Sequence, residues 1–132
     1  MLRSYLAFFV LAMIASLAVA ENPWQRHVID DSSRGADGVR LADFNHDGKL
    51  DFVTGWEQGG ITRIYLQPQT SQVRHKWPSV TVGRTKSVED AVAVDLDADG
   101  YLDVVSSTEG QTQTLFVHWS PNSNDELLKA SA

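Results

Sequence analysis

The sequence has 132 residues, enough for one domain of ordinary size and too few for two large ones. It contains no cysteine, which excludes disulfide scaffolds, thiolate zinc sites and cysteine nucleophiles. The formal net charge is −6 and no two basic residues are adjacent, so nucleic acid and anionic membrane surfaces are poor partners and cations are better ones.

The chain begins with the pattern of a secretory signal peptide. Arg3 precedes an apolar run over residues 5–20 that ends in Ala-Val-Ala, the small-x-small pattern of a cleavage site. A buried core helix or a membrane anchor is the alternative, but the run is short for a span of about 20 residues and Pro23 stops a helix. We therefore expect cleavage after Ala20 and a mature chain that is secreted, periplasmic or on the cell surface, without a membrane segment.

The rest of the chain contains an internal repeat. Residues 39–53 match residues 91–105 at a spacing of 52 positions. The match extends, at a spacing of 53, to a tryptophan upstream and a proline downstream of each copy. The predicted organisation is a repeat region at 21–121, with units at about 24–68 and 77–121, followed by a polar tail at 122–132.

Each repeat unit shows the periodicity of strands. Apolar residues alternate or run continuously beside an acidic loop, and glycines fall between the runs, where turns need positive φ. Each unit offers four short strands: one around Trp24 or Trp77, one entering the acidic loop, one leaving it, and one ending at Pro68 or Pro121. The sequence thus predicts an all-β fold of two four-stranded antiparallel blades of the β-propeller type.

The acidic loops carry the chemistry. Both read D-x-[DN]-x-D-G-x-x-D, in which positions 1, 3, 5 and 9 offer side-chain oxygens, position 7 offers a backbone carbonyl, and Gly at position 6 permits a sharp turn. Seven of the 17 acidic residues lie in these loops, where their repulsion calls for a counterion. The candidate ligands are Asp43, Asn45, Asp47, Lys49 (carbonyl) and Asp51 in the first loop, and Asp95, Asp97, Asp99, Tyr101 (carbonyl) and Asp103 in the second.

Such all-oxygen cages favour Ca²⁺, because calcium accepts six to eight irregular ligands whereas magnesium demands an octahedron and keeps its waters. Two Ca²⁺ sites are predicted. Polar turns without metal are an alternative that the recurrence of the full pattern disfavours. An EF-hand is another, but position 12 holds Thr54 or Ser106 instead of Glu and the flanks are strand-like.

The acidic segments, residues 43–53 and 95–105, resemble the FG-GAP or VCBS-type repeats, which form blades of calcium-bearing β-propellers such as the integrin α-chain head. The resemblance covers nearly all of residues 24–121. It implies that the metal pins a loop between two strands of a blade, with the ligands named above. Neither copy has the Phe-Gly-x-x-x-Gly-Ala-Pro stretch, so the bacterial VCBS variant is the nearer likeness and integrin ligand sites do not transfer.

Two blades are fewer than the roughly four to eight that close a propeller. The sequence leaves three explanations open: a fragment of a longer propeller with further blades in cis, self-association in trans, or a small two-sheet unit. We expect the first.

No catalytic array is evident. The four histidines form no HExxH motif, and there is no G-x-S-x-G elbow. His46 is expected to point to solvent, and Glu57 and Glu109 recur because of the repeat and are not expected to be a glycosidase pair. Trp24 and Trp77 are expected to pack in the core or between blades and not to stack on sugars.

The resulting prediction is an exported, calcium-binding repeat protein, not an enzyme, that serves as a binding, adhesion or scaffold module for a protein or carbohydrate partner. The alternative is an accessory propeller fragment of a larger exported enzyme acting on polysaccharide.

Overall fold

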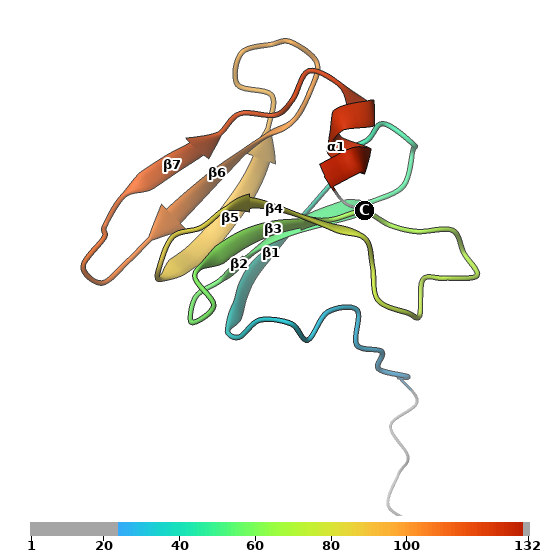
Figure 1. Ribbon diagram of the computed structural model, residues 1–132, viewed down its shortest axis with the longest axis horizontal. Helices are drawn as coiled ribbons and strands as arrows, with labels where there is room; N and C mark the ends of the chain where they lie inside the picture. The colour runs from blue at the N-terminus through green and yellow to red at the C-terminus, as the bar shows by residue number, and fades with distance from the viewer. Residues whose placement is uncertain (1–23, 131–132) are drawn as a thin grey trace, which may run out of the picture.

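The computed structural model describes residues 24–130, so the predicted signal peptide and its cleavage site lie outside the described residues. The described chain is all-β apart from one short helix (Figure 1), and its strands form two antiparallel sheets. In chain order the elements are β1 (Ala36–Ala42), β2 (Asp51–Trp56), β3 (Ile61–Tyr65), β4 (Ser79–Gly83), β5 (Val88–Val94), β6 (Asp103–Thr108), β7 (Leu115–His118) and α1 (Asn124–Ala130).

The first sheet has the order β1-β2-β3-β4, with every neighbouring pair antiparallel. A tight turn joins β2 to β3: the Gly60 N–H donates to the Trp56 carbonyl at 2.7 Å, and Gly60 has a φ of 64°, which a residue with a Cβ rarely adopts. The second sheet has the order β5-β6-β7 and repeats the same meander.

The internal repeat is visible in the strand pairing. β1 shifts register between Asp37 and Val39, and β5 shifts between Val88 and Asp90, within one residue of the equivalent place. The last pair of β1 and β2 is Ala42 with Asp51, and the last pair of β5 and β6 is Val94 with Asp103. Each acidic loop therefore connects two paired strands of one sheet, as predicted.

The expectation of four strands in each unit needs correction. The strand that follows Trp77 is β4, and it pairs with β3 in the first sheet instead of beginning the second. The segment around Trp24 forms no strand, and the second sheet has three strands among the residues the structure describes. A repeat reveals which segments recur but not which edge each one joins. Here the edge is chosen by burial, because Ile64 and the opposing Val80 are 3% and 8% exposed.

The main core lies between the two sheets. β5 packs against β1 and β2, and the core combines residues of both sheets. Its fully or largely buried members include Val53, Ile64, Ala91 and Val104. On the opposite face of the first sheet a second cluster joins Trp56, Ile61 and Tyr65 with Phe52 and Trp77. The tryptophan expectation thus holds for the half-buried Trp77, whereas Trp24 is 82% exposed.

The structure places α1 within residues 122–132, the segment predicted to be a polar tail. Ser123 begins the helix, with its side-chain oxygen accepting from the Glu126 N–H at 3.4 Å. Leu127 is 5% exposed and belongs to the core between the sheets. The helix thus closes the end of the sheets that carries the acidic loops (Figure 1).

The segment before β1 is anchored to the first sheet by Asp30. Its Oδ2 accepts from Arg63 Nη1 and from the Tyr65 hydroxyl, both at 2.6 Å, and its Oδ1 accepts from the Ser32 N–H at 2.8 Å. Burial alone would raise the pKa of Asp30, but these hydrogen bonds hold it well below its usual value.

Replacing this carboxylate by an amide (Asp30→Asn) is expected to lower the free energy of unfolding by about 2 kcal/mol near neutral pH, because charged hydrogen bonds are lost. The depressed pKa means that wild-type Asp30 stabilises the fold above the unfolded pKa of about 3.9 and loses this contribution as the pH falls below it. Urea unfolding at neutral pH and at about pH 3 should therefore show a difference between the two proteins that shrinks in acid. A difference that stays constant would contradict the assignment.

Candidate metal centre

The first acidic loop (residues 43–51) folds around the side chain of Asp43. The Asp43 carboxylate accepts from the backbone N–H of Asp47 at 3.0 Å and of Gly48 at 2.9 Å. Asn45 Oδ1 accepts from the same Asp47 N–H at 3.1 Å. His46 and Gly48 have φ values of 57° and 80°, so the chain curls sharply and gathers the side chains at positions 1, 3 and 5.

The second acidic loop (residues 95–103) repeats this pattern. The Asp95 carboxylate accepts from Asp99 N–H at 3.2 Å and Gly100 N–H at 3.0 Å, and Asp97 Oδ1 accepts from Asp99 N–H at 3.2 Å. Gly100 has a φ of 91°, and an added Cβ would meet no atom within 4 Å. Glycine is therefore required here by the backbone conformation and not by a lack of space.

The loops differ in charge. In the second loop, oxygens of Asp95, Asp97 and Asp99 lie within 4.8 Å of one another, an arrangement that could hold a metal ion. In the first loop Asn45 replaces one carboxylate, and the Lys49 ammonium pairs with Asp47. The hydrogen bond from Lys49 lowers the pKa of Asp47. The second loop thus carries the greater net negative charge.

The aspartate at position 9 of each loop is buried and clamps the loop to the sheet. Asp51 is 0% exposed, and its two oxygens accept from Phe44 N–H at 3.0 Å and Gln67 N–H at 2.7 Å. Burial raises the pKa of Asp51, these hydrogen bonds oppose the rise, and the nearby charges of Asp47 and Asp43 add to it. Asp51 therefore joins the loop to the segment that follows β3.

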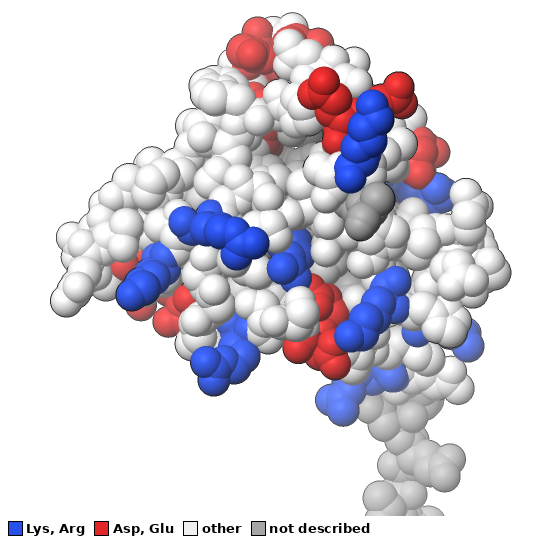
Figure 2. All heavy atoms as spheres, in the orientation of Figure 1, with Lys and Arg blue, Asp and Glu red and all other residues white. Residues whose placement is uncertain are grey.

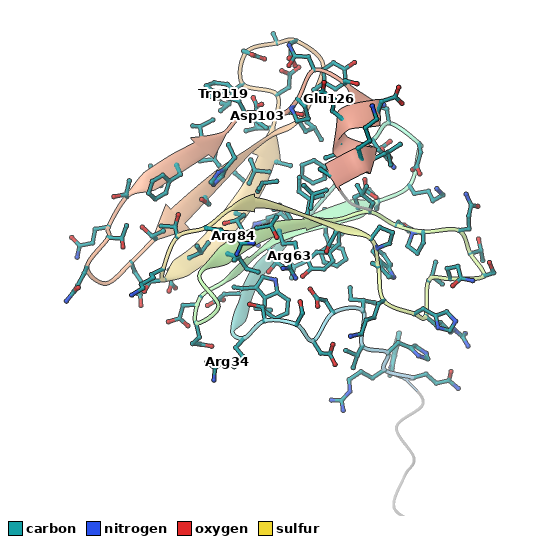
Figure 3. The ribbon with its side chains drawn as sticks, in the orientation of Figure 1. Arg34, Arg63, Arg84, Asp103, Trp119 and Glu126 are labelled. Atoms are coloured by element: carbon teal, nitrogen blue, oxygen red, sulfur yellow. The ribbon has the colours of Figure 1, made fainter. Side chains whose placement is uncertain are left out.

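Asp103 has the equivalent role in the second loop. It is 3% exposed and accepts from Leu96 N–H at 3.2 Å and Ser120 N–H at 2.8 Å. Figure 3 shows Asp103 and Trp119 at the same end of the second sheet. The cluster of Asp95, Asp97 and Asp99 does not include Asp103. The structure shows Asp103 as a clamp, and a contact between Asp103 and the metal stays a prediction. The same is true of Asp51 and of the Lys49 and Tyr101 carbonyls.

The two loops lie side by side at one end of the molecule. The rings of His46 and Tyr101 are 5.8 Å apart between centroids, and the Asn124 amide at the start of α1 donates to the Asn45 carbonyl at 2.8 Å. In Figure 2 acidic side chains gather at the top, over this end of the sheets. His46 is exposed, as expected. Its contact with the other loop was not predicted, because it depends on how the sheets pack.

A second acidic group lies at the other ends of the strands. Oxygens of Asp37, Glu57 and Glu89 approach within 4.8 Å of one another. The pKa of Glu89 is raised by burial and by the neighbouring charges of Glu109, Asp37 and Glu57. The repeat gave the signal for this group, since Asp37 matches Glu89 and Glu57 matches Glu109, but only the packing of the sheets brings the two pairs together.

A cavity of about 190 Å³ lies among the sheets and α1, with a mostly apolar lining that includes Val80, Trp119 and Leu127. His118 also lines it and lies 2.9 Å from the buried Ser106 hydroxyl. Burial lowers the pKa of His118.

No helix within residues 24–130 is long and apolar enough to cross a membrane.

Comparison with known proteins agrees with the repeat. The pattern of the FG-GAP-like repeat family matches residues 43–106, which include both acidic loops. Cartilage acidic protein 1 of Mus musculus is 40% identical over 79 residues, and that of Homo sapiens is 38% identical. Each alignment covers 58% of this chain but 12% of the relative, so the chain spans about one eighth of their length. No solved structure matches.

Proposed function

We propose that this chain, which carries FG-GAP-like repeats across residues 43–106, is an exported calcium-binding module whose metal ions hold the acidic loops rigid. The observation that carries the proposal is the shared fold of the two loops, in which position 1 accepts the same two backbone N–H groups in each copy. In the second loop this fold gathers three carboxylates within 4.8 Å. Hard oxygen donors in an irregular loop suit calcium better than magnesium.

The second loop is proposed to be the tighter site. Calcium affinity rises with the number of charged ligands, and positions 1, 3 and 5 supply Asp95, Asp97 and Asp99 there. The first loop supplies two carboxylates and the Asn45 amide, and calcium must displace the Lys49 ammonium from Asp47. Extracellular calcium modules commonly bind with dissociation constants of about 0.1–1 mM, and we expect affinities in this range.

The role proposed for the rigid loops is binding or adhesion. Calcium would fix the end of the sheets where both loops meet, and with it a surface for a protein or carbohydrate partner. Export is supported by the apolar N-terminal run and by the likeness to proteins named cartilage acidic protein. In a chain without cysteine, metal ions would supply the stabilisation that disulfides give many small exported domains.

Thermal melting tests the proposal. Calcium added to chelator-treated protein is expected to raise the melting temperature in a concentration-dependent way, because it binds the folded loops and not the unfolded chain. Magnesium at the same concentration is the control and should raise it much less. A melting temperature that responds to neither ion, with an unchanged near-ultraviolet spectrum, would refute the proposal.

A further inference from the structure

Six exposed apolar residues of this chain are repeat counterparts of residues that pack in its core. The second sheet contributes Ala91, Ala93 and Leu102 to the core between the sheets. Their counterparts 52 positions earlier are Val39, Leu41 and Leu50, which are 56%, 63% and 56% exposed. We call this last set the front face of the first sheet.

The same relation holds in the other direction. The first sheet and the segments beside it contribute Phe44, Ile64 and Leu66 to the core, and all three are less than 5% exposed. Their counterparts in the second repeat are Leu96, 52 positions later, and Val117 and Trp119, 53 positions later; these are 46%, 43% and 62% exposed. We call this set the back face of the second sheet.

The exposed front face of the first sheet therefore corresponds to one side of the interface between the sheets, and the exposed back face of the second sheet corresponds to the other side. Inside the chain, front-face positions of the second sheet pack on back-face positions of the first. The two exposed faces would meet in the same way if the first sheet of another copy packed on the second sheet of this one.

Strand pairing gives an independent indication. The outer edge of β3 is covered by β4, but the outer edge of β7, its counterpart, has no strand partner among residues 24–130. The repeat counterpart of residues 79–83 is residues 26–30, which form no strand. In the sequence, residues 26–30 precede the strands of the first sheet just as β4 precedes the strands of the second sheet.

Contacts at the ends of these segments agree. Asp30 accepts a hydrogen bond from Tyr65, and its counterpart Gly83 lies against the counterpart of Tyr65, since a Cβ at Gly83 would come 2.4 Å from the His118 ring. Residues 26–30 thus lie against the first sheet in the way that β4 lies against the second. β4 is also paired with a strand of the preceding sheet, whereas residues 26–30 have no such strand among residues 24–130.

We propose that this chain assembles head to tail with further copies of itself. The front face of one copy lies on the back face of a second copy, and residues 26–30 of the first copy lie along the open β7 edge of the second. The contact is heterologous, so it generates a closed ring or an open filament according to the rotation between copies. It follows from the apolar faces and strand edges alone and does not depend on calcium binding.

The test is the mass of the purified protein by sedimentation and light scattering, compared with variants in each face. Leu41→Asp in the front face and Val117→Asp in the back face are expected to give single copies, whereas the wild type gives a multiple of the chain mass. Leu128→Asp, on α1 at a residue 46% exposed and outside both faces, is the matched control and should assemble as the wild type does. Circular dichroism establishes that each variant is folded.

Mixing provides the decisive result. Leu41→Asp keeps a sound back face and Val117→Asp keeps a sound front face, so an equimolar mixture is expected to form two-chain complexes that neither variant forms alone. A wild type that stays a single copy at high concentration would overturn the proposal. An assembly that Leu41→Asp leaves intact would also overturn the proposal, and so would a mixture that gives no new complex. Both results are those of a symmetric dimer, in which the two copies use the same face.

A disulfide test addresses the strand edge, because the chain contains no cysteine of its own. In the first sheet Ile64 pairs with Val80, and their counterparts are Val117 and His27. Val117→Cys mixed with His27→Cys should form a cross-linked dimer on oxidation faster than either variant alone. Equal rates in all three samples would overturn the proposed pairing at β7.

Discussion

Replacing Asp51 with alanine is expected to lower the free energy of unfolding by about 3 kcal/mol, the largest stability effect of any single substitution in the first acidic loop. The Asp51 carboxylate is fully buried and accepts from two backbone N–H groups, at Phe44 and Gln67. Alanine would leave both donors without an acceptor in a site that water does not reach. Urea unfolding in the presence of a chelator measures the loss without any contribution from metal.

Two further substitutions make the result specific. Asp103→Ala should cause a similar loss, since Asp103 accepts from Leu96 and Ser120 N–H groups in the same way. Asp47→Ala, at an exposed position of the same loop as Asp51, should change the stability of the metal-free protein by less than about 1 kcal/mol. If Asp51→Ala were harmless in chelator and costly only with calcium, Asp51 would be a metal ligand alone and the clamp would be refuted.

The largest expected effect on binding is that of Asp99→Ala. This change removes one of three carboxylates from the second loop and leaves the first loop untouched, so the affinity of one site should fall about 100-fold, or ~2.7 kcal/mol, while the other is unchanged. A two-site calcium titration separates the effects. Equal weakening of both sites would contradict independent loops.

Asp97→Asn is the graded counterpart of that experiment, because it gives the second loop the residue that the first loop has at position 3, Asn45. It should weaken the second site by less than Asp99→Ala does. The reverse change, Asn45→Asp, should strengthen the first site. Opposite signs for these two substitutions would follow from charge count alone.

The acidic loops could be predicted from the sequence because their geometry is local. The spacing of the aspartates and the glycine at position 6 determine where the side chains converge, and both loops adopt the same hydrogen-bond pattern. The clamp that Asp51 forms between the loop and the sheet could not be predicted from the sequence. Its partner Gln67 lies 16 residues further along the chain, and nothing in the motif distinguishes a carboxylate that binds metal from one that accepts N–H groups of the sheet.

The strands were predicted more fully than their pairing. The alternation around Ile64 and after Trp77 indicated strands in both places, but a repeat has the same pattern whichever sheet a strand joins. The structure assigns β4 to the first sheet through the buried pair of Ile64 and Val80.

The helix α1 was missed for a related reason. One buried residue, Leu127, in a short acidic segment is too weak a pattern to indicate a helix. Its position depends on the apolar space that the two sheets leave at their end, which is a property of the packed molecule.

Calcium binding by the acidic loops is tested most directly by the number of calcium ions bound per chain, determined by calorimetric titration of chelator-treated wild-type protein. Two ions of unequal affinity, with the tighter one lost in Asp99→Ala, are the predicted result. No binding at calcium concentrations of about 10 mM, well above the range of extracellular modules, would contradict the claim that metal holds these loops.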